Sequence, residues 1–144
     1  TDRIVPFEKG AGPRRLAIAD DGILWVPLNG KAQLARVNTA TGVVEARYQI
    51  PDHGSTPYGV TLDKKRNVIW AATSNSDRVY RFDIDTERWS HYPLPRRESF
   101  VRMMELDPAT GDLWTTYSSL PVGKRDSAVY GTQSANNMLV RIRP

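Results

Sequence analysis

The feature that most constrains the fold is a pattern that the chain carries three times. In each copy a short run of residues ends on a tryptophan. These tryptophans are Trp25, Trp70 and Trp114, at spacings of 45 and 44 residues. A second marker precedes each tryptophan and keeps a spacing of 44 residues: Gly12-Pro13-Arg14, Thr56-Pro57-Tyr58 and Phe100-Val101-Arg102. A period in the low forties with several short strands per unit is typical of a β-propeller blade. The sequence therefore predicts an all-β chain.

The second repeat shows the expected strands of one blade most clearly. Four runs rich in β-branched and aromatic residues occur at Tyr58–Leu62, Val68–Ala72, Arg78–Phe82 and Arg88–Tyr92. Asp, Asn and Ser separate these runs, which is ordinary strand-and-turn chemistry. The first repeat divides in the same way, with an expected first strand at about Arg15–Ala19. The predicted fold is a β-propeller of three four-stranded blades, each with its tryptophan in the core.

The repeats are expected at about residues 9–52, 53–96 and 97–144. The third repeat differs from the others. Arg141 follows Trp114 after 27 residues, whereas in the first two repeats the equivalent arginine follows its tryptophan after 11. This difference predicts an inserted loop at about residues 118–136, rich in Ser, Gly and Pro. The third repeat also reads as only three strands, while residues 1–8 resemble a fourth strand and are expected to be an orphan outer strand.

Three blades rarely close a ring. An unpaired edge strand invites pairing, so the orphan strand should complete a three-stranded blade somewhere. The chain is therefore expected to be part of a larger propeller, or half of a ring closed by a partner. In the second case, two copies would form a six-bladed, two-fold assembly.

Composition narrows the function only slightly. The 144 residues are 40% hydrophobic and 25% charged, as in ordinary globular domains. Cysteine is absent, which excludes thiolate chemistry, and no apolar run is long enough for a membrane span. The net charge is +4, but the short basic clusters stand at different places in the repeats, so they are expected to be solvated turns rather than a nucleic-acid surface.

The repeat resembles that of the virginiamycin B (streptogramin B) lyase family. The resemblance covers most of the chain and is carried by Pro57-Tyr58-Gly59-Val60, Ile69-Trp70, Val79–Asp83 and Tyr92-Pro93-Leu94-Pro95. It implies a seven-bladed ring of which this chain would supply the last three blades and one strand of the blade before. It also implies a periplasmic or secreted location.

The enzymes of that family open a cyclic depsipeptide by elimination, with a histidine base and a magnesium ion. Their catalytic histidines follow the proline of Pro-x-Gly, and a magnesium-associated glutamate stands two residues before such a histidine. Here the post-proline positions hold Arg14, Tyr58 and Arg102, and the earlier positions hold Gly12, Thr56 and Phe100. None is histidine or glutamate, so the resemblance carries the fold, while the lyase chemistry is expected to be absent. No cofactor is evident, and magnesium is implied by the resemblance only.

Repeat geometry predicts a candidate site. Loops alternate between the two faces of a four-stranded blade, and the first strand of each blade lines the channel. Arg14, Tyr58 and Arg102 should therefore surround the channel mouth, with the inserted loop on the same face. Two guanidiniums and a phenol suit a carboxylate or phosphate ligand, whereas the alternative is pairing with carboxylates from neighbouring blades.

The two histidines and the aspartate-rich turns complete the candidates. His53 lies in the loop that enters the second repeat, on the candidate face, and is a weak candidate for a base. His91 is expected on an outer strand. Asp20-Asp21-Gly22 and Asp107–Gly111 lack the ligand count of a calcium loop and read as turns. No cluster has metal-ligand spacing.

These features support one leading hypothesis and one alternative. The leading hypothesis is a lyase-like propeller binding module or subunit that recognises a small anionic ligand or a protein partner, and that associates with itself or another propeller-forming chain. The alternative is a magnesium-dependent lyase that acts on a cyclic ester or lactone with further catalytic residues from other blades.

Overall fold

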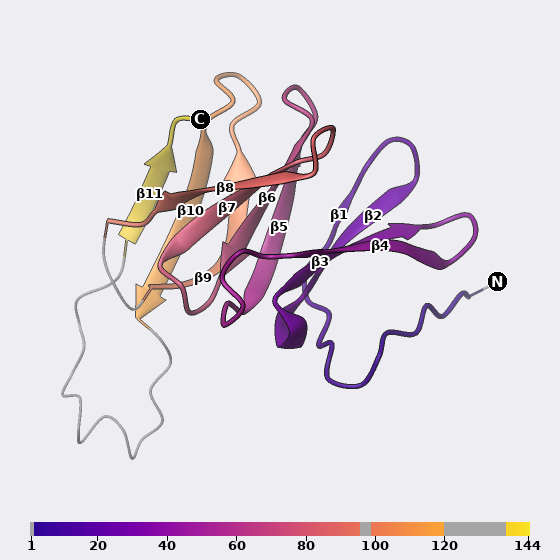
Figure 1. Cartoon of the computed structure of the whole chain (residues 1–144). Coiled ribbons are helices and arrows are strands. Elements are labelled where there is room, and N and C mark those ends of the chain that lie inside the picture. The colour runs from indigo at the N-terminus through magenta and orange to yellow at the C-terminus, as the bar shows by residue number, and fades with distance from the viewer. Residues whose placement is uncertain (1, 96–98, 120–137) are drawn as a thin grey trace, which may run out of the picture.

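The computed structural model describes residues 2–95, 99–119 and 138–144. These residues form eleven strands and one short 3₁₀ turn (Figure 1). The strands are β1 (Ala17–Ile18), β2 (Ile23–Leu28), β3 (Gln33–Asn38), β4 (Val43–Gln49), β5 (Pro57–Asp63), β6 (Val68–Thr73), β7 (Arg78–Asp83), β8 (Arg88–Pro93), β9 (Ser99–Leu106), β10 (Leu113–Ser119) and β11 (Met138–Ile142). The turn η1 spans Asn29–Lys31. No helix in these described ranges is long and apolar enough to cross a membrane.

The strands form three antiparallel sheets in chain order, β1-β2-β3-β4, β5-β6-β7-β8 and β9-β10-β11. Figure 1 shows the sheets side by side, each turned relative to the next. This arrangement confirms the predicted all-β fold of a partial propeller. The third sheet has three strands within the described residues, as the shorter third repeat predicted. We refer to the three sheets as blades 1, 2 and 3.

The hydrophobic core lies between the blades. Trp25 of blade 1 packs in one cluster with Tyr80 and Phe82 of blade 2. Trp70 of blade 2 packs in a second cluster with Val101 and other residues of blade 3. Both tryptophans are buried, which confirms their predicted core role, but Trp114 is only half-buried because no described residue of a further blade covers it.

The predicted first strand at Arg15–Ala19 is shorter in the structure. The strand β1 that pairs with β2 is Ala17–Ile18, and upstream of it Pro13 forms an isolated bridge with Leu28. The register places Arg15 opposite Pro27, and proline has no backbone N–H to donate to a ladder. The backbone N–H of Arg15 instead donates to the Tyr58 carbonyl of blade 2, over 3.2 Å. The inner edge of blade 1 is therefore joined to the next blade.

Residues 2–8, within the predicted orphan strand 1–8, form no strand in this structure. The Arg3 guanidinium donates to the Thr39 carbonyl over 3.0 Å. Val5 and Phe7 pack against the apolar face of blade 1 that points away from blade 2. The segment lies on blade 1, and its pairing with a three-stranded blade stays a prediction.

The inserted loop begins later than predicted. Ser118 and Ser119 belong to β10 and pair with Phe100 and Ser99. Residues 120–136 of the predicted insertion lie outside the described residues, so its position over the mouth stays a prediction.

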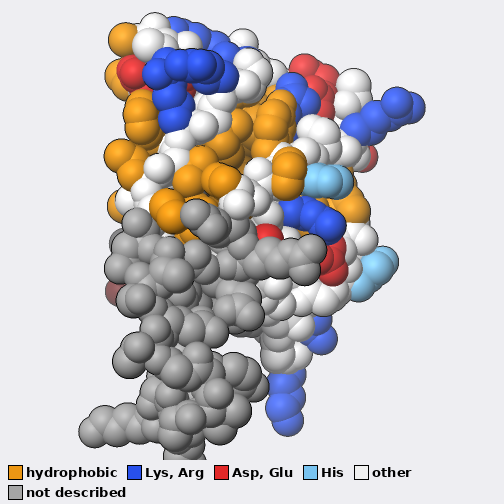
Figure 2. Space-filling view, turned by 90° about the vertical axis from the view of Figure 1, so that its left-hand side faces the viewer, with side chains coloured by type: hydrophobic (Ala, Val, Ile, Leu, Met, Phe, Trp, Pro, Cys, Tyr) orange, Lys and Arg blue, Asp and Glu red, His pale blue; other side chains and the backbone are white. Residues whose placement is uncertain are grey.

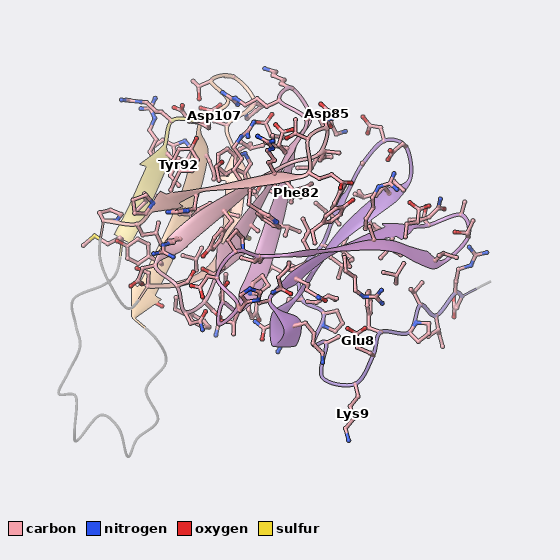
Figure 3. The ribbon with its side chains drawn as sticks, in the orientation of Figure 1. Glu8, Lys9, Phe82, Asp85, Tyr92 and Asp107 are labelled. Carbon is pink, nitrogen blue, oxygen red and sulfur yellow. The ribbon has the colours of Figure 1, made fainter. Side chains whose placement is uncertain are left out.

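The predicted sharing of faces by loops is confirmed in blades 1 and 2. The backbone N–H of Asn29 donates to Gly12 over 3.1 Å, and that of Ser74 donates to Thr56 over 3.0 Å. Each bond joins a loop between the second and third strands to the segment that enters the same blade. Figure 3 shows the opposite end of the molecule, where Asp85 and Asp107 lie far from Glu8 and Lys9.

The Asp107–Gly111 segment is a turn, as predicted. The Asp107 carboxylate accepts the Ala109 N–H and the Thr110 hydroxyl, each over 2.9 Å. The Ala109 N–H is the main reason that the pKa of Asp107 lies below its usual value, and the Thr110 hydroxyl adds to it. The carboxylate is thus used within the turn.

Gly59 lets the inner strands of blades 2 and 3 approach closely. A Cβ at Gly59 would lie 2.6 Å from the Arg102 carbonyl oxygen, a backbone atom that cannot swing away. We predict that Gly59→Ala lowers the free energy of unfolding by about 1–3 kcal/mol, since the strands must separate. Urea unfolding followed by tryptophan fluorescence measures the change.

Gly54→Ala is the matched control for this prediction. A Cβ at Gly54 meets its nearest atom at 3.6 Å, an ordinary contact, and Gly54 lies in an exposed loop. Its effect should stay within about 0.5 kcal/mol. Equal stability of the two variants would contradict the close-approach argument.

Candidate functional site

The three candidate residues stand on the innermost segments of the three blades. Arg14 lies three residues before β1, Tyr58 is the second residue of β5, and Arg102 lies within β9. Adjacent inner segments are joined by hydrogen bonds: Arg15 to the Tyr58 carbonyl over 3.2 Å, and the Thr61 hydroxyl to the Met104 carbonyl over 2.6 Å. These bonds hold equivalent repeat positions next to one another, so side chains from three blades can converge.

The structure brings all three candidate side chains together around one ring. The guanidinium carbon of Arg14 lies 5.7 Å from the Tyr58 ring centroid, and that of Arg102 lies 5.9 Å from it. Both distances are within the range of cation–π attraction. The phenol ring thus positions two cations that would otherwise repel each other.

Phe100 is a fourth member that the sequence argument did not identify as functional. The Arg102 guanidinium carbon lies 4.6 Å from its ring centroid, and the Tyr58 and Phe100 centroids are 6.3 Å apart. A signal was available, because Phe100 stands two residues before Arg102, where the other repeats have Gly12 and Thr56. We call these four residues, Arg14, Tyr58, Phe100 and Arg102, the arginine–aromatic cluster.

The positive charge of this cluster is not neutralised within the described part of the chain. Arg14 and Arg102 are exposed, and neither forms an ion pair with a described carboxylate. Arg14 donates only a long hydrogen bond, 3.4 Å, to the Pro13 carbonyl. By contrast, Arg36 pairs with Glu45 and Arg141 with Asp112. The cluster therefore leaves two guanidiniums with free donors.

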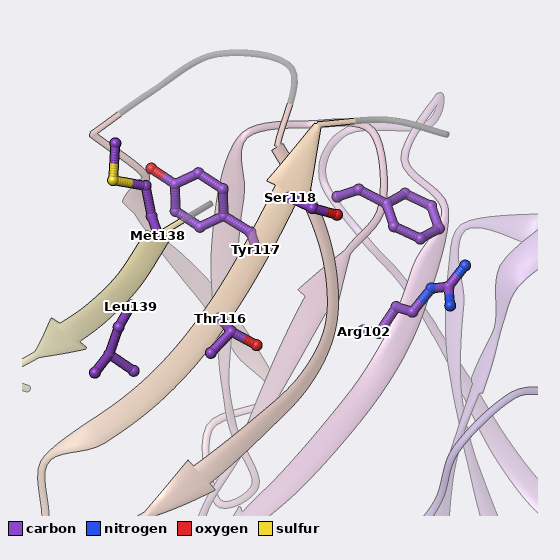
Figure 4. Close-up of a pocket in the computed structure, with 7 residues that line it drawn as sticks. Arg102, Thr116, Tyr117, Ser118, Met138 and Leu139 are labelled. Carbon is purple, nitrogen blue, oxygen red and sulfur yellow. The ribbon is translucent and has the colours of Figure 1, made fainter. Parts of the chain in front are cut away.

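Open space adjoins the cluster. A hollow of about 520 Å³ is lined by Phe100, Arg102, Thr116 and Ser118, among others (Figure 4). A second groove, of about 320 Å³, follows the inner strands and is lined by Arg15, Leu16, Gly59 and Met103, among others. The Arg15 guanidinium reaches the Met103 sulfur at 3.7 Å. A ligand held by the guanidiniums would meet both hydroxyl and apolar groups.

His53 lies on the expected face but apart from these contacts. The Asn75 amide donates to the Gly54 carbonyl over 2.8 Å and so ties the loop of His53 to the loop between β6 and β7. The imidazole is exposed, and no hydrogen bond, ion pair or ring contact joins it to the cluster in the described residues. His91 lies on β8, the outermost strand of blade 2, as expected.

The arginine–aromatic cluster does not fit the magnesium ion that the family resemblance implies. Magnesium takes oxygen ligands, above all carboxylates, whereas the cluster offers two guanidiniums and two aromatic rings. Elsewhere in the described ranges, no group of three or more His, Asp or Glu side chains could hold a metal ion. We therefore derive no step through magnesium.

Comparisons with known proteins agree on the fold. No protein-family model and no curated protein sequence matches the chain. A streptogramin B lyase structure matches with a TM-score of 0.68 and 20% identity, over 95% of this chain and 42% of that one. Catalytically inactive virginiamycin B lyase from Staphylococcus aureus, with quinupristin, matches with a TM-score of 0.67 and 22% identity, over 95% and 43%. A luciferin-regenerating enzyme matches with a TM-score of 0.67 and 16% identity, over 92% and 45%.

These likenesses confirm the lyase-like propeller resemblance that the repeat predicted. The chain spans less than half of the length of each of these three structures. They carry the names of different enzymes, so the shared fold selects no activity. The function has to be argued from the arginine–aromatic cluster itself.

The Tyr58 ring should determine how well the two guanidiniums are held. We predict that Tyr58→Ala increases the motion of both side chains, because each loses a contact of about 0.5–1 kcal/mol. ¹⁵N relaxation of the arginine Nε–H groups measures this motion. Tyr58→Phe keeps the ring and should leave the relaxation of both groups unchanged. Increased motion in Tyr58→Phe would show that the hydroxyl, not the ring, positions the arginines.

Proposed function

We propose that this chain is a propeller binding module that recognises a small anionic ligand at the arginine–aromatic cluster. The observation that carries the proposal is the pair of exposed guanidiniums beside one ring, which form no ion pair within the described residues. A guanidinium presents planar N–H donors that match a carboxylate or phosphate, and charge-assisted bonds of this kind are strong. Two such groups, from different blades and beside the same ring, make this site positive and attract an anion.

The surroundings favour a ligand with an apolar part. The rings of Tyr58 and Phe100 are half-buried and offer faces for stacking. Leu16 and Met103, on the adjoining groove, are 53% and 48% exposed. Exposed apolar side chains beside a few converging polar groups are typical of small-molecule sites. An aromatic or aliphatic carboxylate would satisfy both parts.

Binding is a better proposal than elimination. A general base has to lose a proton near neutral pH, and an arginine side chain is too basic to do so. His53, which could serve as a base, makes no contact with the cluster in the described residues. We therefore do not propose the elimination reaction of the streptogramin B lyases for this chain. It has a similar fold, with different residues at the candidate site.

Benzoate is the simplest probe of this proposal. We predict that the chain binds benzoate more tightly than the uncharged isostere benzamide, measured by ligand-observed NMR. Replacing Arg102 with Gln should weaken benzoate binding roughly tenfold to a hundredfold, because a charge-assisted hydrogen bond contributes about 1.5–3 kcal/mol. Arg14→Gln should act in the same direction.

Arg88→Gln is the matched control, since Arg88 is an exposed arginine on β8, far from the inner strands in the blade order. It should leave benzoate binding unchanged apart from a small effect of net charge. Higher salt should weaken binding to the native chain. Equal binding of benzoate to the native chain and to the Arg14→Gln/Arg102→Gln double variant would contradict the proposal.

A further inference from the structure

Blade 3 presents a face whose equivalents in blades 1 and 2 are covered by the next blade. In the antiparallel ladders, Trp25 pairs with Arg36, Trp70 with Arg81 and Trp114 with Arg141. Two residues before each arginine stands an aliphatic side chain. Leu34 and Val79 are 0% exposed, whereas Leu139 is 67% exposed. This repeat position is thus buried in blades 1 and 2 and exposed in blade 3.

The neighbourhood of Leu139 is apolar as well. A hollow of about 150 Å³ on this side is lined by Met103, Trp114, Thr116 and Leu139, among others. Figure 2 shows hydrophobic side chains gathered on the end of the molecule at which β11 lies. We call these four residues, Met103, Trp114, Thr116 and Leu139, the open face. Large exposed apolar patches mark interaction sites.

The two interfaces between blades inside the chain show what kind of surface packs against such a face. Each is covered by the apolar face of a following blade, for example by Tyr80 and Phe82 over Trp25. Blade 1 has an equivalent face, with Val26, Leu28 and Val37 in its buried cluster. A second copy of the chain therefore carries a face of this kind, packed under its own Val5 and Phe7.

The N-terminal segment strengthens the choice of a second copy. Tyr48 at the end of β4 pairs with Leu34, and Tyr92 on β8 pairs with Val79. Both tyrosines pack into the interface with the following blade. Val5 packs against blade 1 in the same way, so residues 2–7 lie where the fourth strand of a preceding blade would lie. One partner thus offers both a blade face and a segment, residues 2–7, that lies in the position of a fourth strand.

Strand β11 can accept that strand. Within the described residues it pairs with β10 alone, so its other edge has free backbone N–H and C=O groups. The repeat register makes the pairing specific. Because Leu34 opposes Tyr48 and Val79 opposes Tyr92, Leu139 should oppose Val5, and Val140 should oppose Ile4.

We propose that a second copy of this chain covers the open face. Its residues 2–7 pair with β11 as a fourth strand, and its first blade packs on Trp114 and Leu139. Each copy carries both surfaces, so the contact can be made twice about a two-fold axis, which closes a ring of two copies.

The oligomeric state of the 144-residue chain tests this proposal. Native mass spectrometry over a concentration series should find a dimer. Leu139→Glu places a charge in the interface and should raise the dimer dissociation constant at least about tenfold. Val43→Glu is the matched control, because Val43 is an aliphatic residue that is 53% exposed on β4, away from the open face, and it should not affect dimerisation. A native chain that stays monomeric, or a dimer that Leu139→Glu leaves intact, overturns the proposal.

A cysteine pair tests the register independently of stability. The chain has no cysteine, so Ile4→Cys in one tagged copy and Val140→Cys in another introduce the only two thiols. Oxidation of the mixture should give a disulfide between the two tags. Oxidation of either variant alone should give much less covalent dimer, because the two identical thiols lie far apart across the ring. A native dimer without the mixed disulfide would also overturn the proposal.

Discussion

The packing of one blade against the next is the constraint on which the rest of this structure depends. Each blade alone is a small twisted sheet with apolar side chains on both faces, and such a sheet is marginal until something covers it. Trp25 and Trp70 fill the two interfaces inside the chain. The inner strands approach most closely at Gly59, where any side chain would meet the backbone of Arg102. The close approach fixes how far apart equivalent residues of successive blades can lie.

This regular spacing produces the site. Arg14, Tyr58 and Arg102 are separated by more than 40 residues each, yet they meet because all three occupy one offset in the repeat. The order of residue types also matters. A cation, an aromatic ring and a second cation on successive blades place the ring between like charges, and its negative face attracts both. A carboxylate at one of these three positions would have neutralised one of the two positive charges.

The sequence predicted the blades and the convergence because both follow from the repeat. Period-two strands, polar turns and tryptophan spacing need only local patterns. The departures have non-local causes. β1 is shortened by Pro27 of the neighbouring strand, which cannot donate to its ladder. Phe100 joins the cluster through a ring-to-guanidinium contact; the sequence marks it only as a departure from Gly12 and Thr56, and the contact itself depends on the fold.

The half-buried state of Trp114 was not predictable for a similar reason. Its sequence context matches that of Trp25 and Trp70, so the pattern predicts burial for all three. Burial, however, depends on what lies against the face, and among the described residues a following blade covers two of the three faces. Similar local sequence therefore gives a buried tryptophan twice and a half-buried one once.

The open face and the arginine–aromatic cluster are linked through blade 3. Phe100, Arg102 and Met103 are consecutive or nearly so on β9, and they contribute to the cluster, to the adjoining groove and to the open face. A partner blade on the open face would bring the cluster of a second copy to the same mouth, so that four guanidiniums surround one channel. Their mutual repulsion opposes association, and a bound anion removes part of it. By thermodynamic linkage, an anion that binds the dimer more tightly than the single chain must favour dimerisation to the same degree. In such an assembly, ligand binding and ring closure would both depend on the repulsion among the four guanidiniums.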